Sequence, residues 1–590
     1  MCPHKGPKKE KQSKDTLDNK AHKRNMADDV VEEKEPMDID QSNESRGQQQ
    51  KRQRIERQLN QPEGELIVEA RKLWETVRGG DLADDVRNER LQTLLDLISG
   101  KIKDITFKHD MSRVVQTCLK LGNEKQRDQI AEELKGSYLL LSQSMYGRHI
   151  LLRILKYCNR YRKDVVSAFY GRVRKMIRHK DASVVLEECY AVYASSQQRW
   201  NLVAEFFGNE FAVFKNDTAV RSLKEILEKS PMKRDTAMDT LKTTLVPLLQ
   251  KGTVQHSLVH RALLEYLQNA NEKERGEIIE QMHELCVEIL HTREGAHATI
   301  LCILHGSAKD RKLILRSMRP FLARIASEEY GHAVLIAILD CMDDTVFLGK
   351  NMLPDLCAIT SDLVTNQYGR RVLLYILAGR NPYYVGTEYL SIMTANAAVY
   401  QATTKKNSEL RHLQLTQYIS ESMINWVAEN ASTAIFDALP SQAVSETLLH
   451  ATGEGKDKAW DAVLELINRD LEMEEENHVL LNKISNAVIT TCIYSEGAEN
   501  SKRFSSKMGL PELPENNPKY ANSVLDALVE SDQLVKAACA GSFPVRALLD
   551  TSTTKERARK LLKPHVNELK EAANNAEKPG IIKAILARLE

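Results

Sequence analysis

The sequence predicts an all-α protein built as an α-solenoid, an open array of stacked helical repeats. The chain has 590 residues, well beyond the roughly 250–300 residues that one hydrophobic core can organise. Leu, Ala, Glu and Lys, which favour helix, are abundant. One helical segment recurs at steps of about 34–39 residues, a period typical of helical repeat arrays. No polar–apolar alternation persists long enough to predict a sheet.

The repeated segment is an apolar helix preceded by a short punctuation signal, which is Tyr-Gly, Glu-Gly or a lone Asp. We expect Gly147, Gly331 and Gly369 to let the preceding helix approach closely, and Asp110 and Asp181 to cap helix N-termini. The copies are KHDMSRVVQTCLK (108–120), SMYGRHILLRILK (144–156), HKDASVVLEECYA (179–191), VQHSLVHRALLEY (254–266), TREGAHATILCIL (292–304), EEYGHAVLIAILD (328–340) and NQYGRRVLLYILA (366–378), with weaker units at 441–450, 519–530 and 542–552. The step between the third and fourth copies is double, and we expect a degenerate unit in this gap, which NDTAVRSLKEILE (216–228) fits.

The chain divides into three predicted parts. Residues 1–62 carry blocks of charge without apolar periodicity, so we expect a disordered charged tail. Residues 63–380 hold the regular repeats and begin with a helix near 66–78. Residues 381–590 hold degenerate repeats, after a proline-containing break at 379–390 and with a loop at 403–410. The tail contains a basic cluster that is a candidate nuclear import signal, formed by Lys51, Arg52, Arg54 and Arg57.

The formal net charge of +1 conceals a strong asymmetry along the chain. Residues 101–185 carry 19 Lys and Arg against 8 Asp and Glu, whereas residues 440–530 carry 8 against 16. A basic arm attracts a polyanion, and an acidic arm can contact basic proteins. The charge pattern therefore favours nucleic acid as the partner of the first arm.

The polar face of the first copy is the candidate nucleic-acid surface. On a helical wheel Ser112, Arg113 and Gln116 lie at about 0–100°, and the apolar side chains of this helix lie at about 200–340°. We therefore expect this triplet to face outward, with equivalent triplets of later copies lining the same surface. The expected core residues of the helix are Val114, Val115, Cys118 and Leu119. Base-edge recognition is expected of the first copy alone, since apolar residues replace the amide at Leu152, Leu186, Ile300, Ile336 and Leu374.

Basic side chains around the repeated helices are the candidate phosphate contacts. Arg113 could also stack on a base through its planar guanidinium. The complete candidate set is Lys108, Ser112, Arg113, Gln116, Arg148, His149, Lys180, Arg221, Lys224, His256, His260, Arg261, Arg370 and Arg371.

Catalytic, metal and membrane signatures are missing from the sequence, and we expect neither an enzyme nor a cofactor or metal site. The segment ATGEGKDKAW (451–460) lacks the Gly and the Ser or Thr that a phosphate-binding P-loop requires. The ten cysteines stand singly and match small core residues better than zinc ligands. No apolar run reaches the roughly 20 residues that span a bilayer. The N-terminus has no apolar core of a secretory signal.

The repeated segments resemble pumilio repeats, and KHDMSRVVQTCLK (108–120) resembles their signature most closely. In that family the first and fifth residues of a five-residue stretch on the repeated helix bind a base edge, and the second residue stacks on the base. The resemblance therefore implies base-edge roles for Ser112 and Gln116 and a stacking role for Arg113. The segments RKLWETVR (71–78), LLDLISGKIKDITFKHDMSRVVQTCLK (94–120), LVHRALLEY (258–266) and DRKLILRSM (310–318) are similar to the nucleolar Puf-A or pumilio-like branch, which has a CPL-like C-terminal region. The resemblance runs from about residue 66 to the end and weakens beyond about 378.

This resemblance implies an L-shaped, two-arm array of about eleven repeats that binds RNA and DNA with little sequence preference. It also implies a role in nucleolar pre-rRNA processing and in biogenesis of the large (60S) ribosomal subunit. We expect a monomer in the nucleus and nucleolus that contacts pre-60S ribosomal particle proteins and no membrane. Two alternatives stay open: a sequence-selective mRNA-binding translational repressor, and a protein-binding helical-repeat scaffold.

Overall fold

A computed structural model describes residue 53 and residues 63–79, 82–208, 210–211, 222–471, 478–497 and 517–590. The predicted tail, apart from residue 53, lies outside the described residues, as do the four basic residues of the import signal and Arg221. The chain separates into two units, residues 1–68 and 69–590. The second unit contains all the helices discussed below except the first turns of α2 (Gly64–Val77).

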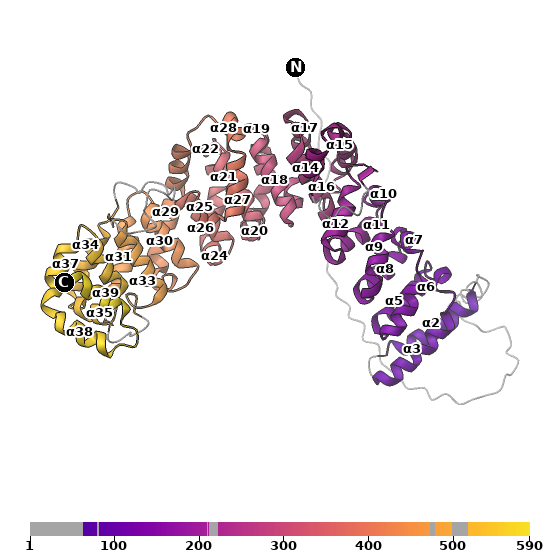
Figure 1. Cartoon of the computed structure of the whole chain (residues 1–590), viewed down its shortest axis with the longest axis horizontal. Coiled ribbons are helices and arrows are strands. Elements are labelled where there is room, and N and C mark those ends of the chain that lie inside the picture. The colour runs from indigo at the N-terminus through magenta and orange to yellow at the C-terminus, as the bar shows by residue number, and fades with distance from the viewer. Residues whose placement is uncertain are drawn as a thin grey trace, which may run out of the picture. The chain divides into compact units, whose positions relative to one another are not determined.

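The second unit is built on a continuous row of helices, here called the repeat row, in which neighbours pack side by side. Its members follow one another in chain order (Figure 1). Between the third and fourth members the contact is made by a π-helical turn, Cys189–Tyr193, that extends α11. The row consists of α5 (His109–Leu121), α8 (Gly147–Tyr157), α11 (Ala182–Glu188), α16 (Ser257–Asn269), α18 (Arg293–His305), α21 (Gly331–Cys341), α25 (Gly369–Ala378), α30 (Pro440–His450), α33 (Lys483–Tyr494) and α36 (Phe543–Asp550).

Other helices alternate with the row, and the described residues contain no strand. The longer ones are α3 (Asp84–Ile98), α6 (Glu124–Glu133), α12 (Ser196–Ala204), α15 (Arg234–Gln250), α17 (Glu272–Met282), α19 (Ala308–Met318), α29 (Ser408–Ala434), α31 (Lys456–Ile467), α34 (Tyr520–Glu530), α38 (Val566–Asn575) and α39 (Gly580–Leu589). The shorter ones are α4 (Ile102–Ile105), α7 (Tyr138–Gln143), α9 (Arg162–Ser167), α10 (Val173–Met176), α14 (Leu223–Lys229), α20 (Leu322–Ser327), α22 (Thr345–Asn351), α23 (Leu353–Cys357), α24 (Thr360–Thr365), α26 (Pro382–Val385), α27 (Thr387–Ala395), α28 (Ala397–Thr403), α35 (Leu534–Cys539) and α37 (Lys555–Leu562).

The all-α solenoid prediction is confirmed, and so is the core of the first repeated helix. Val114, Val115, Cys118 and Leu119 are completely buried. The prediction for the weaker repeats was partly wrong, because α34 (519–530 in the sequence pattern) packs beside α31 and α33 and is not a member of the row. The row position belongs to α33, whose polar Ser485, Asn486 and Thr490 disguise the apolar pattern.

Close helix approach explains the glycines at the start of row helices. A Cβ at Gly147 would lie 2.8 Å from the carbonyl oxygen of Leu141, and one at Gly331 would lie 2.5 Å from that of Ile325. Real Cβ atoms do not come this close to backbone oxygen, so only glycine fits there. The predicted role of these glycines is confirmed.

The predicted caps Asp110 and Asp181 are wrong, since neither side chain caps its helix. Their carboxylates pair instead with arginines, 3.3 Å from Arg71 and 2.9 Å from Arg148. Four helices of the alternating set begin with a reciprocal cap, in which the N-cap side chain and the side chain of the third helical residue each accept from the other's backbone N–H. These caps are Asn123, Ser195, Asn271 and Ser307.

A recurring arginine ties four row helices, α5, α8, α16 and α18, to the helix that follows each of them. Arg127 donates from Nε to the carbonyl of Leu119 at 2.9 Å and from Nη2 to that of Lys120 at 3.0 Å. These carbonyls end α5 and lack partners inside the helix, so the guanidinium satisfies them and complements the helix dipole. The same tie is made by Arg162, Arg275 and Arg311. Part of the positive charge in the sequence is therefore internal.

Lys456 of α31 takes the equivalent place, donating from Nζ to the carbonyl of Leu449 at 3.2 Å. It is 5% exposed, and burial lowers the pKa of its ammonium to about 7. This lysine belongs to the segment 451–460 that superficially resembled a phosphate loop, and its role here is to close α30. No helix in the described part of the chain is long and apolar enough to cross a membrane. The described residues include no cluster of His, Cys, Asp and Glu placed to hold a metal.

Candidate nucleic-acid interface

The triplet of the first repeat does not face outward as a unit, contrary to the sequence-based expectation. Arg113 is exposed, but Ser112 is 1% exposed. Its hydroxyl donates to the carbonyl of Tyr146 at 2.9 Å, and accepts from Nε2 of Gln116 at 3.0 Å. The Gln116 Oε1 in turn accepts from Nε of Arg153 at 3.4 Å. The two residues assigned to a base edge thus link the first repeat to the second.

The second repeat presents a charged pair of which one member is engaged. Arg148 is half-buried and lies 2.9 Å from the carboxylate of Asp181 in the next repeat. His149 is exposed, and burial and the neighbouring Arg148 lower the pKa of its imidazole. A neutral imidazole contributes hydrogen bonds and stacking rather than charge at neutral pH. The free positive charge of this repeat is therefore smaller than the sequence suggested.

Three lysines of the candidate set lie at helix starts. Lys180 and Lys224 are exposed, and Lys108 is half-buried just before α5. Lys224 lies 3.9 Å from Glu228 one turn further along α14, an exposed pair that contributes little stability. Lys180, immediately before α11, is available to a phosphate.

The fourth row helix uses its candidate residues for packing, which corrects the prediction for them. His260 is completely buried, with Nδ1 2.6 Å from Oγ1 of Thr292 and Nε2 2.6 Å from the carbonyl of Val254. Arg261 donates to Oε1 of buried Glu265 at 2.6 Å. His260 cannot contact a ligand, since both ring nitrogens are bonded within the fold.

His256 is half-buried, 4.0 Å from Oε2 of Glu187, and burial lowers its pKa. The last candidate pair lies on α25. Arg370 donates to Oε1 of Gln442 on α30, and burial lowers the pKa of its guanidinium. The Arg371 guanidinium lies 5.8 Å from the ring centre of Tyr368. These contacts hold neighbouring repeats together and leave only part of each side chain accessible.

The position equivalent to Gln116 is buried in most of the later repeats. Four of its five apolar residues, Leu186, Ile300, Ile336 and Leu374, are at most 1% exposed. A base edge cannot reach these four buried positions.

Two exposed cations on the row were missed by the sequence reasoning, Lys120 at the end of α5 and Lys156 at the end of α8. The sequence could have identified them, because each is the last residue of its 13-residue copy of the repeat. Arg113, Lys120, Lys156 and Lys180 are therefore exposed cations on or beside the first three row helices. They can contact phosphates, and contacts to phosphates carry no sequence information.

The buried imidazole of His260 makes the fold acid-sensitive. Burial lowers its pKa to about 3, from the ordinary value of 6.5. Because the folded-state pKa is the lower one, the contribution to stability is complete above pH 6.5 and is lost as the pH falls towards 3. The loss is about 2 kcal/mol at about pH 5, at roughly 1.4 kcal/mol per pH unit. We expect the free energy of unfolding of His260→Gln, measured with urea, to change less than that of the wild type between neutral pH and about pH 5.

The control is His565→Gln, whose ring is partly exposed and hydrogen-bonded only to Glu568 in the described residues. It should keep the wild-type pH dependence. Identical pH profiles for His260→Gln and the wild type would contradict the prediction.

The sequence of this chain is similar to those of known proteins. Residues 365–503 match the CPL (NUC119) domain. The Pumilio homology domain family member 6 of Schizosaccharomyces pombe is 32% identical over 526 residues, which are 88% of this chain and 80% of that protein. Pumilio homolog 3 of Homo sapiens is 35% identical over 392 residues, which are 66% of this chain but only 60% of that protein.

A solved structure extends the similarity to the fold. The crystal structure of human Puf-A in complex with DNA matches with a TM-score of 0.78 at 28% identity, over 89% of this chain and 100% of that chain. The repeat row, the CPL match and the identity to the two relatives agree with one another. The chain therefore belongs to the Puf-A-type branch of the pumilio-like family.

Proposed function

We propose that this chain binds RNA and DNA with low sequence specificity, through the exposed cations of the first three repeats. One observation carries the proposal: an excess of 11 positive charges over residues 101–185 coincides with base-edge positions that are already bonded or buried. Such a surface attracts phosphates without distinguishing bases. The related human Puf-A has been crystallised with DNA, which supports the same partner class here.

We further propose that it acts in nucleolar pre-rRNA processing and 60S subunit biogenesis, as a monomer among proteins of the pre-60S particle. Support comes from the resemblance to the nucleolar branch and from the basic cluster at residues 51–57, a candidate import signal. The test is to crosslink the protein to RNA in cells and sequence the fragments. Enrichment of precursor rRNA is expected, whereas a set of mRNAs sharing one motif would favour the translational repressor.

Salt should weaken the binding strongly. With about four phosphates contacted, affinity for a single strand should fall about 50-fold between about 50 and 200 mM salt, because each contact releases condensed counterions. Fluorescence anisotropy with several unrelated RNAs and a single-stranded DNA measures this directly. Affinities within about tenfold of one another are expected. A preference for one short motif beyond about a hundredfold, equivalent to roughly 2.8 kcal/mol, would contradict the low-specificity proposal.

A further inference from the structure

Three helices after α25 leave the repeat row and return to repeats that lie earlier in the chain. They are α26, α27 and α28, which cover residues 382–403, and α28 packs on α18 (Figure 1). Nε2 of His305, at the end of α18, lies 2.9 Å from Oδ1 of Asn396. Arg311 of α19 donates to Oγ1 of Thr403 at 2.8 Å. The segment therefore lies along α18 and its neighbours.

The first turn of α27 places a carboxylate and an aromatic ring on this surface. Oε1 of Glu388 accepts from Nε of Arg293 at 2.9 Å and lies 3.2 Å from Nε2 of His297. The ring of Tyr389 stands edge-on to those of His297 and His332, with centroid distances of 5.8 and 5.9 Å. One dipeptide thus occupies two adjacent repeats at once.

The positions that it occupies correspond to the triplet of the first repeat. His297 is the equivalent of Arg113, the stacking position, and His332 is the equivalent of Ser112 in the following repeat. Nε2 of His332 is buried and has no hydrogen-bond partner in the described part of the chain. Buried polar atoms are normally satisfied, so this nitrogen is suited to a ligand that brings its own acceptor or donor.

An anion beside a planar ring is also the chemistry of a nucleotide, in which phosphate and base take these roles. We propose that α27 is a built-in occupant of a latent single-stranded nucleic-acid site on α18 and α21, with Glu388 in the place of a phosphate and Tyr389 in the place of a base. This inference rests on the proposed function, because it extends the same binding activity to two further repeats.

The segment is fixed at both ends and held lightly between them. At its start Tyr384 is buried against Leu374 and Ala378, and its hydroxyl donates to Glu446. All nine residues of α27 are described, and only Met393 among them is buried. A helix with so little buried surface opens at low free-energy cost.

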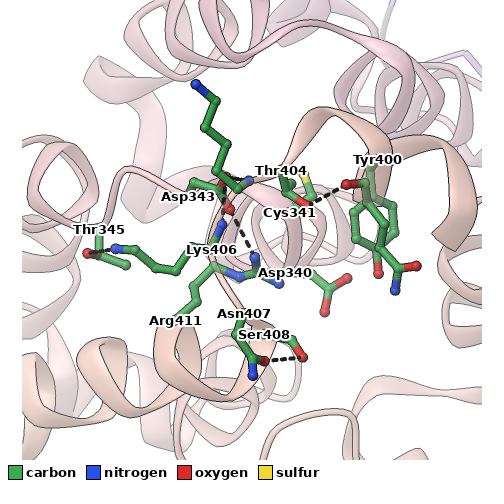
Figure 2. Close-up of polar contacts among 12 residues, drawn as sticks. Asp340, Cys341, Asp343, Thr345, Tyr400, Thr404, Lys406, Asn407, Ser408 and Arg411 are labelled. Atoms are coloured by element: carbon green, nitrogen blue, oxygen red, sulfur yellow. Dashed lines mark hydrogen bonds and ion pairs between the residues drawn. The ribbon is translucent and has the colours of Figure 1, made fainter.

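The other end of the segment is anchored by two carboxylates, Asp340 in the last turn of α21 and Asp343 just after that helix. Asp340 accepts from Nε of Arg380 at 2.8 Å, and the same guanidinium contacts the hydroxyl of buried Tyr400. Nη1 of Arg411 donates to Oδ1 of Asp343 at 3.2 Å, and Figure 2 shows the two side chains facing each other. The Asp343 carboxylate also accepts from the backbone N–H groups of Lys405 and Lys406, in the loop after α28. The α27 helix can therefore move away from α18 and α21 while both ends of the segment 382–403 stay in place.

The test compares the wild type with Glu388→Gln/Tyr389→Ala in the full chain. A photoreactive oligouridine RNA, long enough to span the repeat row, is crosslinked to each, and the crosslinked peptides are mapped by mass spectrometry. Crosslinks on α18 and α21 should rise about tenfold in the variant, because a site that is mostly occupied shows an affinity reduced by the open fraction. Crosslinks on α5, α8 and α11 should stay unchanged.

Two matched controls separate this effect from charge and from helix loss. Thr394→Ala changes an exposed residue of the same helix, and Glu421→Gln removes an equally negative, exposed side chain from α29. Neither should raise crosslinking on α18 or α21. If circular dichroism shows that the double variant has lost helix, Glu388→Gln alone decides, since its side chain is 42% exposed and it should give a smaller rise in the same direction.

Unchanged crosslinking on α18 and α21, with normal crosslinking on α5 to α11, would overturn the inference and leave the proposed function intact. Crosslinks confined to α18 and α21 of the variant would support the inference and remove the proposed site on the first repeats. No crosslinks in either protein would overturn both.

Discussion

Replacing Arg113 and Lys180 together with Glu is expected to weaken binding to every single-stranded nucleic acid about a hundredfold. Both side chains are exposed on or beside row helices. The change removes two phosphate contacts and adds two repulsions, which is on the order of 3 kcal/mol. It should also flatten the salt dependence, since fewer counterions are released. Anisotropy at two salt concentrations measures both effects.

The control with the same change in net charge is Lys570→Glu/Lys583→Glu, at exposed positions of α38 and α39. It should lower affinity only slightly. Gln116→Ala tests base reading, and we expect less than a tenfold loss, because a neutral hydrogen bond contributes about 0.5–1.5 kcal/mol. If Gln116→Ala weakened binding more than the double charge reversal, and for one RNA in particular, the first repeat would read sequence. Ser112 is unsuitable for this test, because its buried hydroxyl holds the next repeat.

Gly295→Ala is expected to destabilise the repeat array by about 3 kcal/mol or more, at the upper end for overpacking. A Cβ at this position would lie 1.9 Å from the carbonyl oxygen of Ile289. The obstacle is backbone, so a rotamer change cannot relieve it. The amide of Gly295 also donates to the capping Oγ1 of Thr292 at 3.0 Å, which fixes the turn. Chemical denaturation followed by circular dichroism should show a lower midpoint.

Gly276→Ala is the matched control, because a Cβ there meets no atom within 4 Å and the residue lies inside α17. It should raise stability by up to about 1 kcal/mol, the difference in helix propensity between alanine and glycine. Equal stability of the two alanine variants would show that the turn before α18 adapts, and would contradict the proposed reason for glycine.

The architecture could be predicted because its signals are local. Apolar spacing within each copy identified the row helices, and the buried Val114 and Cys118 follow from helical periodicity alone. The two-arm shape, the division at residue 380 and the disordered tail stay predictions. The CPL match begins at residue 365, ahead of α25.

The candidate site was harder to predict, because exposure depends on the neighbouring repeat. Ser112 lies only about 20° from Leu119 on the helical wheel, so the carbonyl of Tyr146 could cover it. His260 carries no sequence signal of its two internal partners, Thr292 and the Val254 carbonyl, which lie in different repeats or turns. The path of α26 to α28 is equally hidden, because its contacts join residues far apart in sequence.

Those long-range contacts change how unfolding can spread through the chain. In a solenoid whose units touch only neighbours, opening can stop at any interface, as in a one-dimensional cooperative chain. Here the His305 to Asn396 bond spans 91 residues and the Arg311 to Thr403 bond spans 92. Neither joins a nearest-neighbour pair, so the repeats from α18 to α25 are braced into one cooperative block. Under mechanical stretching, the array should separate first on either side of this block.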